Sequence, residues 1–354
     1  MKIGVYDPYL DDLGGGEKYM MTLASCLAKR HTVSVFWNNK KDIEDIQERF
    51  AIDFSDINVV KNIFTAKTNF FKRAAALAKY DRVIYLSDGS LPFVIKKNLF
   101  VHIQQPLEQI NTLFLKDKWK LRNVLAFFCN SEYTKSFIEK KIGKRVFILY
   151  PPIILSPKNI KKENSILHVG RFRTKNIEID DYKKQFFMVE VFKEMIDRGL
   201  KNWHFSLAVS LKDDDKEAFA KIQELAKNYP IKFFINKTNQ ELWDLYSKAK
   251  IYWHASGYGE NLEKFPENAE HFGISTVEAM GAGAVPVVIN AGGQKEIVTR
   301  DSGLVWNTKE ELVKKTLQLI KDEALLLNMS KNAVKRANFF AGNKFCKEVE
   351  QLIL

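Results

Sequence analysis

Short runs of apolar residues recur along the whole chain, and many of them are apolar without a break. The run Val124 to Cys129, for example, reads Val-Leu-Ala-Phe-Phe-Cys. A strand with one face in water alternates apolar and polar residues, whereas an unbroken apolar run indicates a strand buried on both faces of a parallel sheet. Helical patterns stand between these runs, in the first half at 17–30, 68–80, 106–121 and 131–142. The sequence therefore predicts an α/β fold built from doubly wound parallel sheets.

The alternation is interrupted at Tyr150-Pro151-Pro152, and the following stretch to Asn164 has little periodicity. Two prolines and a loss of periodicity are typical of an interdomain linker. A chain of 354 residues also corresponds to about two domains. We therefore predict one domain over 1–152 and a second over 153–339. The expected strands of the two domains lie at 2–7, 32–37, 82–87, 99–103, 124–129 and 146–149, and at 165–169, 203–210, 231–235, 250–254, 285–289 and 303–306.

Apolar content and cysteine usage narrow the class of protein. The chain has no run of eighteen apolar residues, so a membrane-spanning helix is not expected, and its first residues lack the apolar core of a signal peptide. Its three cysteines, Cys26, Cys129 and Cys346, lie far apart and form no C-x-x-C pair. This pattern favours a reducing compartment without a thiolate metal site, and we expect a cytoplasmic protein, at most peripheral on the inner face of a membrane.

The net charge is +12, and residues 1–152 carry +8 of it. A basic half favours acidic partners such as a phosphorylated substrate or an anionic membrane, although simple solubility explains the charge as well. Two stretches, Lys67 to Lys79 and Leu113 to Arg122, mix aromatic and basic residues as membrane-surface segments do, but ordinary packing helices fit them equally. No nucleic-acid-binding module is recognisable, so nucleic acid is not an expected partner.

The stretch from Glu270 to Gly283 concentrates the chemistry of the second half. It places carboxylates at Glu270 and Glu278, with Gly273 between them, and reads as a loop that enters a helix. Ser275 and Glu278 have the Ser-x-x-Glu spacing of a capping box. Because a helix N-terminus offers unpaired N–H groups and partial positive charge, this stretch predicts a phosphate-binding helix start with a carboxylate at each end.

Further candidate residues follow predicted strands, where ligands of open α/β sheets bind. The glycines Gly14 to Gly16 precede a helix and allow close approach of a phosphate, although they match neither the G-x-G-x-x-G nor the P-loop pattern. His102 ends the strand 99–103, and Arg171 follows the strand 165–169. Lys183 and Lys184 stand at the start of a helix, where cations oppose the helix dipole unless they bind an anion. The six histidines show no metal-ligand spacing, so no metal is expected.

In this order along the chain, these motifs resemble the retaining family-4 glycosyltransferases of GT-B fold, which use nucleotide-sugar donors. The resemblance covers nearly the whole chain and is strongest in the Glu-x7-Glu motif of Glu270 and Glu278, within Glu-His-Phe-Gly-Ile. It also includes Gly14-Gly15-Gly16-Glu17, Tyr150-Pro151-Pro152, Gly170-Arg171 and Gly292-Gly293. The motifs look most like those of mannosyltransferases of lipid-linked oligosaccharides and of enzymes of bacterial surface-polysaccharide assembly.

The resemblance implies a role for each matching residue. Glu270 would contact hydroxyls of the donor sugar, Glu278 the ribose hydroxyls, and His102 would lie beside the reacting sugar. Arg171 and Lys183 would neutralise the diphosphate of the donor. The backbone of Phe272, Gly273 and Ile274 would contact its sugar and phosphates, and Gly15 and Gly16 would close over the phosphates from the first domain. It further implies two Rossmann-like domains facing across a cleft, the first for the acceptor and the second for an NDP-sugar donor. A final helix at 340–354 would pack on the first domain, and neither metal nor cofactor would be needed.

The expected activity is transfer of mannose or a similar hexose, with retention, to a glycan or lipid-linked glycan. A spacing of eight residues supports this assignment, since a helix of that length rises about 12 Å and separates the carboxylates more than the roughly 5 Å of a retaining hydrolase pair. The alternatives are a nucleotide-sugar epimerase on the same fold and a non-catalytic protein that binds membrane or polyanion. The sequence departs from the family by a long loop, Phe172 to Tyr182, so that Lys184 is a second candidate phosphate ligand, and by a charged insertion at 257–269.

Overall fold

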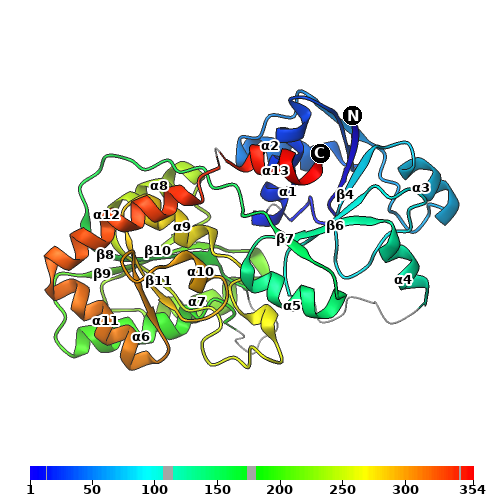
Figure 1. Cartoon of the computed structure of the whole chain (residues 1–354). Coiled ribbons are helices and arrows are strands. Elements are labelled where there is room, and N and C mark those ends of the chain that lie inside the picture. Colours follow the sequence, from blue (N-terminus) through cyan, green and yellow to red (C-terminus); the bar gives the residue numbers. More distant parts are fainter. Residues whose placement is uncertain (13, 107–114, 174–180, 343) are drawn as a thin grey trace. The chain divides into compact units, whose positions relative to one another are not determined.

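The described strands form two parallel sheets, which belong to two separate units of the chain (Figure 1). Unit 1 comprises Met1–Pro152 and Gly342–Leu354, and unit 2 comprises Ile153–Ala341. The computed structural model describes residues 1–354 except 13, 107–114, 174–180 and 343. The C-terminal segment therefore returns to the unit that contains the N-terminus.

The sheet of unit 1 has seven strands in the order β3-β2-β1-β4-β5-β6-β7, all paired in parallel. The direction of strand order reverses between β1 and β4, so the carboxyl ends of these two strands form the switch point at which ligands of such sheets bind. The strands are β1 Lys2–Tyr6, β2 Thr32–Phe36, β3 Ile57–Val60, β4 Arg82–Leu86, β5 Leu99–Ile103, β6 Val124–Cys129 and β7 Val146–Ile148.

Helices cover both faces of this sheet, because its central strands are apolar on both sides. One buried cluster joins the sheet to α1, α2 and α13, and another joins it to α3, α4 and α5. This double covering matches the doubly wound fold expected from the unbroken apolar runs. The helices are α1 Gly15–Ala28, α2 Lys40–Phe50, α3 Phe70–Leu77, α4 Leu115–Arg122, α5 Glu132–Ile142 and α13 Phe345–Ile353.

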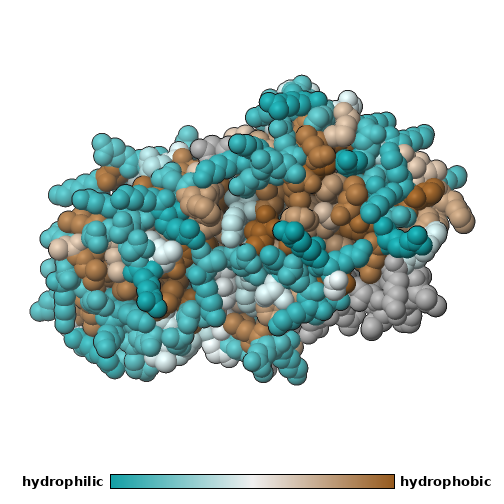
Figure 2. All heavy atoms as spheres, in the orientation of Figure 1, coloured by the Kyte–Doolittle hydropathy of each residue, from teal (hydrophilic) through white to brown (hydrophobic). Residues whose placement is uncertain are grey.

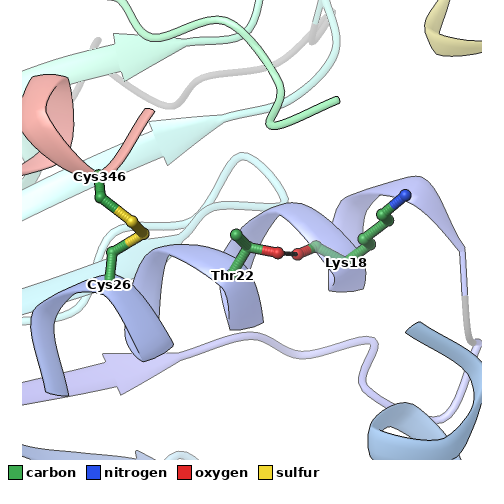
Figure 3. The surroundings of a disulfide bond; sticks show 4 residues. All are labelled: Lys18, Thr22, Cys26 and Cys346. Atoms are coloured by element: carbon green, nitrogen blue, oxygen red, sulfur yellow. Dashed lines mark hydrogen bonds between the residues drawn. A yellow bond between two sulfur atoms is a disulfide. The ribbon is translucent and has the colours of Figure 1, made fainter. Parts of the chain in front are cut away.

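A disulfide joins α1 to the C-terminal helix α13 (Figure 3). Cys26 and Cys346 are 320 residues apart in sequence, with their Cα atoms 5.1 Å from each other. The cysteine spacing gave no sign of this pair, because sequence separation says nothing of distance once a terminal helix docks on the first helix. The support that unpaired cysteines gave to a reducing compartment is removed. The third thiol, of Cys129, is buried and donates to the carbonyl of Ser131 at 3.3 Å.

The sheet of unit 2 has six parallel strands in the order β10-β9-β8-β11-β12-β13. Its order reverses between β8 and β11, which places its switch point at the carboxyl ends of those strands. The strands are β8 Glu163–Arg171, β9 His204–Ser210, β10 Ile231–Ile235, β11 Ala249–His254, β12 Val285–Ile289 and β13 Leu304–Trp306.

The helices of unit 2 likewise pack on both faces of its sheet. The larger buried cluster contains side chains of α6, α7, α11 and α12, and the smaller one contains side chains of α8 and α9. The helices are α6 Gln185–Asp197, α7 Lys216–Leu225, α8 Asn239–Lys248, α9 Ile274–Gly281, α10 Gln294–Ile297, α11 Lys309–Lys321 and α12 Glu323–Phe339, with single 3-10 turns at η1 Asp213–Asp215 and η2 Pro266–Asn268.

The predicted linker is fastened to unit 2. Ile153 is fully buried and pairs with Ala341 as an isolated bridge, so the two crossings between the units lie side by side. Lys162 donates to the carbonyls of Ala249 and Ala282 at 2.7 and 2.6 Å. Its pKa falls to about 8 because the ammonium is buried. The linker therefore serves as a structural part of unit 2.

The sequence located the strands of both sheets except β3, and it also missed α2. A helix expected at 106–121 is described only from Leu115 onward as α4, and residues 107–114 lie outside the described part of the chain. Among the residues that the structure describes, no helix has the length and apolar character needed to cross a bilayer.

Candidate active site

The loop that carries Glu270 enters helix α9 through a glycine that no other residue could replace without strain. Gly273 caps α9 with φ at +116°, in the left-handed region that favours glycine. A Cβ at this position would lie 2.4 Å from the side-chain nitrogen Nε2 of Gln294. The first N–H groups of α9, which have no partners within the helix, therefore follow immediately after the segment Glu270 to Phe272.

Two further glycines, Gly292 and Gly293, pack against the backbone of this loop. The amide of Gly293 donates to the carbonyl of Glu270 at 2.8 Å. A Cβ on Gly292 would lie 2.2 Å from the same carbonyl oxygen, and one on Gly293 would lie 2.5 Å from the Cα of Phe272. The Gly292-Gly293 pair therefore allows two backbone segments to touch, and it fixes the path of the chain through Glu270.

The carboxylate of Glu270 is held by two cationic or polar partners on one oxygen. Its Oε2 accepts from Lys183 Nζ at 2.6 Å and lies 2.9 Å from Nε2 of His254. The Glu270 side chain is 20% exposed, whereas that of His254 is 1% exposed. Within the described part of the chain, no hydrogen bond ends on the other oxygen, Oε1. The arrangement fixes the carboxylate and leaves one oxygen able to accept a hydrogen bond from a ligand.

Burial and charge act in opposite directions on this carboxylate. Burial raises the pKa of Glu270, but Lys183 and His254 outweigh it and hold that pKa well below its usual range. Burial lowers the pKa of His254, so its ring is neutral at pH 7 and its Nε2–H donates to Glu270. Glu270 is therefore an ionised acceptor near neutral pH. This charge state suits recognition of sugar hydroxyls, because an ionised carboxylate accepts hydrogen bonds and has no proton to donate.

Glu278 and Ser275 do not form the predicted capping box, which was wrong. Helix α9 has no side-chain cap, because its N-cap is Gly273. The hydroxyl of Tyr252 pairs with Ser275 Oγ at 2.8 Å, and the hydroxyl of Tyr246 donates to Glu278 Oε2 at 2.9 Å. Tertiary partners have therefore taken both side chains that local spacing assigned to the cap, and Glu278 is held against α8 at the other end of the motif.

The cations of the site lie at the end of β8 and on the loop that follows it. Arg171 ends β8, and His254 ends the neighbouring strand β11, so both stand at the switch point of the unit 2 sheet. Lys184 Nζ forms an ion pair with Glu260. The hydroxyl of Tyr182 donates to the carbonyl of Ala269 at 3.1 Å. The end of the long loop is thus bound to the 257–269 insertion, while residues 174–180 within that loop lie outside the described part of the chain.

The glycine loop of unit 1 leads into α1. Gly14 caps the helix, and its amide donates to the Glu17 carboxylate at 2.5 Å. Gly15 is the first residue of α1, and a Cβ on Gly16 would lie 2.1 Å from the side-chain nitrogen Nε2 of Gln104. Absence of a side chain at Gly16 thus lets the helix start contact the residue that follows β5, close to the switch point of this sheet.

His102 is deeply buried in unit 1. Its ring stacks between those of Tyr19 and Phe128, with centroids 4.5 and 4.7 Å away, and none of its surface is exposed. Burial lowers its pKa to about 3, so the ring is neutral at physiological pH. The structure therefore places His102 in the buried core of unit 1 as a stacking partner of α1.

Sequence reasoning overlooked several residues that complete the site. His254 ends a predicted strand, the same signal that singled out His102, whereas Glu260 and Tyr246 carry no local signal. Gln294 is fully buried against Gly273, and neither of its amide atoms has a hydrogen-bond partner in the described part of the chain. The described residues hold no group of three or more His, Cys, Asp or Glu side chains arranged to bind a metal ion.

Solved structures share this architecture over the entire chain. Anabaena Alr3699/HepE in complex with UDP and glucose has a TM-score of 0.68 at 16% identity, covering 100% of this chain and 99% of that one. A glycosyltransferase from Rickettsia africae ESF-5 has a TM-score of 0.72 at 15% identity, covering 99% and 97%. WaaG, involved in lipopolysaccharide biosynthesis, has a TM-score of 0.61 at 15% identity, covering 100% and 99%. Two Rossmann-like domains with these neighbours define a GT-B fold.

The family described as "Glycosyl transferases group 1" matches residues 153–336, which is more than half of the chain. The protein belongs to this family and is a glycosyltransferase. The matched residues comprise nearly all of unit 2, including Glu270, Glu278 and the cations after β8. The resemblance first suggested by the Glu-x7-Glu motif is confirmed as far as the glycosyl transferases group 1 family and the GT-B fold.

Curated relatives include two kinds of sugar transferase. A Dictyostelium discoideum GDP-Man:Man(3)GlcNAc(2)-PP-Dol alpha-1,2-mannosyltransferase is 26% identical over 61% of this chain and 44% of its own length. A Campylobacter jejuni GalNAc-alpha-(1->4)-GalNAc-alpha-(1->3)-diNAcBac-PP-undecaprenol alpha-1,4-N-acetyl-D-galactosaminyltransferase is 23% identical over 96% and 95%. The chain spans less than half of the length of the curated mannosyltransferases that it matches.

Proposed function

We propose that the protein is a retaining family-4 glycosyltransferase that moves mannose or a similar hexose from an NDP-sugar to a glycan or lipid-linked glycan without a metal. The observation that carries the donor site is the Glu270 carboxylate, held on one oxygen by Lys183 and His254 at the switch point of the unit 2 sheet. The names of the curated relatives, which include lipid-linked saccharides, support the acceptor class.

In this proposal the parts of the donor are distributed along the motif. Oε1 of Glu270 accepts hydrogen bonds from the sugar hydroxyls, and Glu278 accepts them from the ribose. The backbone of Phe272, Gly273 and Ile274, at the start of α9, receives the sugar and the diphosphate. Fixing Glu270 in advance lowers the entropic cost of binding, because its side chain is already immobile.

The diphosphate charge is balanced by Arg171 together with Lys183 or Lys184. The Lys183 ammonium has three donors, one of which bonds to Glu270, so others remain for phosphate oxygens. Lys184 has to share its ammonium with Glu260 or leave that carboxylate. Separate Lys183→Ala and Lys184→Ala variants identify the phosphate ligand, which is the one whose loss weakens binding of the free nucleoside diphosphate more.

The chemical step consists of one substitution at the anomeric carbon. The acceptor oxygen forms a bond to this carbon on the face from which the diphosphate leaves, the carbon–oxygen bond to the diphosphate breaks, and a diphosphate oxygen takes the proton of the acceptor hydroxyl. Arg171 and Lys183 stabilise the charge that develops on the leaving group, and such electrostatic stabilisation is commonly the largest catalytic contribution. No metal ion is required for this charge balance.

A donor panel tests the proposal. We expect one NDP-sugar to raise the melting temperature of the protein by mass action and to be hydrolysed slowly or transferred. Glu270→Gln removes the charge and is expected to lower the turnover of that donor at least about a hundredfold. Glu263→Gln, at an exposed glutamate of the 257–269 insertion that precedes Glu270, is the matched control. No response to any donor, or equal turnover in both variants, would contradict the assignment.

The two alternatives make different predictions for the same samples. A nucleotide-sugar epimerase converts its donor without an acceptor, and NMR of the incubated sugar would show a second configuration. A non-catalytic protein that binds membrane or polyanion leaves every donor unchanged. The presence of Glu270, Arg171 and Lys183 at one edge of the unit 2 sheet favours the transferase, since a scaffold has no need of this arrangement.

For unit 1 we propose the acceptor site, with Gly15 and Gly16 approaching the donor phosphates. His102 is proposed to act beside the reacting sugar, and its burial makes a specific test possible. His102→Phe keeps the ring stack with Tyr19 but removes both nitrogens. Loss of turnover in a stably folded His102→Phe enzyme supports the chemical role, whereas full activity assigns His102 to packing alone. A lipid-linked acceptor would bring the enzyme to a membrane as a peripheral protein.

A further inference from the structure

Three aromatic rings from separate segments of unit 1 form an exposed stack. Phe70 at the start of α3 stacks on Phe93 with centroids 4.5 Å apart, and Phe93 stacks on Trp119 of α4 at 4.9 Å. Phe71 meets Phe70 edge-on at 5.4 Å. The exposed fractions are 46% for Phe70, 75% for Phe71 and 55% for Trp119, and Ile95 adds another side chain at 62%. We call these five residues the aromatic face.

The aromatic face is a feature of the fold and not of one flexible side chain. In Figure 1, α3 and α4 lie at the same end of unit 1, and in Figure 2 brown and tan spheres lie over α3 with teal spheres beside them. The Arg73 guanidinium donates to the carbonyls of Ile63 and Thr65, which ties the preceding loop to α3. Contiguous exposed apolar groups of this kind mark an interaction site.

Basic side chains surround the aromatic face, and carboxylates are scarce there. Residues 57–80 contain five Lys and Arg and neither Asp nor Glu, and residues 89–107 contain two lysines and no acid. Lys67, Lys72, Lys97 and Arg122 are exposed, and in the described part of the chain none of these four forms an ion pair with a carboxylate. The local charge is therefore positive and available to an anionic partner.

We propose that the aromatic face is the surface by which unit 1 binds an anionic phospholipid bilayer. Phe71, Trp119 and Ile95 would enter the boundary between headgroups and acyl chains, where aromatic side chains are favoured, and Lys67, Lys72 and Lys97 would contact lipid phosphates. Residues 57–80, 89–107 and 115–122, which supply the aromatic face, together carry eleven Lys and Arg against one acid, Asp117, and this excess of positive charge favours an anionic bilayer. The inference rests on the proposed function only in that a lipid-linked acceptor gives membrane binding its purpose.

Vesicle sedimentation of the full chain tests this surface. We expect binding to vesicles of phosphatidylcholine with phosphatidylglycerol, weaker binding to phosphatidylcholine alone, and loss of most binding at about 0.5 M salt. Phe71→Ala/Trp119→Ala and Lys72→Glu/Lys97→Glu should each weaken binding at least about tenfold. Leu327→Ala/Lys331→Glu, which changes an equally exposed pair on α12 of unit 2, is the control and should bind as wild type does.

The outcomes separate this inference from the proposed activity. Wild type that fails to sediment with anionic vesicles at low salt overturns the inference, as do face variants that sediment like wild type. Dimerisation that the face variants abolish, without vesicle binding, would overturn it in favour of a second copy of the chain. Donor turnover measured without lipid should be unchanged in the face variants, whereas Glu270→Gln should lose turnover and still bind vesicles. Circular dichroism verifies that each variant is folded.

Discussion

Asp7 is the most unusual ionisable residue of unit 1, and its replacement gives a quantitative test of the structure. It follows β1 at the switch point and is fully buried. Its Oδ1 accepts from the amide of Tyr9 at 2.9 Å, whereas no hydrogen bond from the described residues reaches Oδ2. Burial, reinforced by the nearby carboxylate of Glu17, raises the pKa of Asp7 from 3.8 to about 8. The folded protein therefore keeps Asp7 protonated at neutral pH.

The sign of the pH dependence follows from the raised pKa. Below about pH 4 Asp7 is protonated in both states, and its contribution to the free energy of unfolding is intact. As the pH rises from about 4 to about 8, only the unfolded chain releases the proton, so the free energy of unfolding falls by about 1.4 kcal/mol per unit. The whole shift of about four units corresponds to at most about 6 kcal/mol.

Asp7→Asn retains the shape of the side chain and removes this titration. We expect the variant to melt about 5 °C or more above wild type near pH 8, and this gap to close toward pH 4. Thermal unfolding across that range measures it, with the exposed Asp56→Asn in the same unit as control. A gap between Asp7→Asn and wild type that is the same at both ends of the range would refute the argument, because Asp7 would then titrate as an ordinary carboxylate.

Three other changes address the site and the disulfide. His254→Ala removes one of the two partners of Glu270 Oε2, and we expect kcat/KM for the donor to fall about ten- to a hundredfold with the fold retained. Unchanged kinetics would show that His254 is not needed to hold the Glu270 carboxylate. Gly293→Ala forces a Cβ against the loop that carries Glu270, so urea unfolding should show a loss of about 1–3 kcal/mol. Cys346→Ser frees α13 from Cys26 and should lower the stability of unit 1 by about 2–4 kcal/mol, with reductant producing the same loss in wild type but none in the variant.

The strands were predictable because each is specified by its own residues. Val124 to Cys129 is apolar throughout and is buried at four of its six positions, and the largely apolar strands Leu99–Ile103 and Val285–Ile289 are buried at every position. The edge strand Ile57–Val60 was missed because only one of its four residues is buried, so it lacks that pattern. Helix α2 was missed as well, although Asn39 caps it.

The candidate site was predictable in its residues but not in its contacts. The Glu-x7-Glu spacing selected Glu270 and Glu278 together, yet the partners of Glu270 are 16 and 87 residues away in sequence. Local spacing also favoured a cap between Ser275 and Glu278, which tyrosines of α8 and β11 prevent by bonding to both side chains. A spacing rule considers only residues close in sequence, so it cannot predict a hydrogen bond to a tyrosine hydroxyl that folding brings near.

The sequence alone determined the alternation of strands and helices, the family and the residues of the donor motif, because periodicity and motif spacing are local properties. Tertiary structure decided which oxygen of Glu270 is occupied, why Asp7 resists ionisation and how Cys26 meets Cys346 across 320 residues. Charge state and pairing depend on burial and on neighbours brought together by folding. Those quantities come into being only when the sheets are assembled and their helices are packed on them.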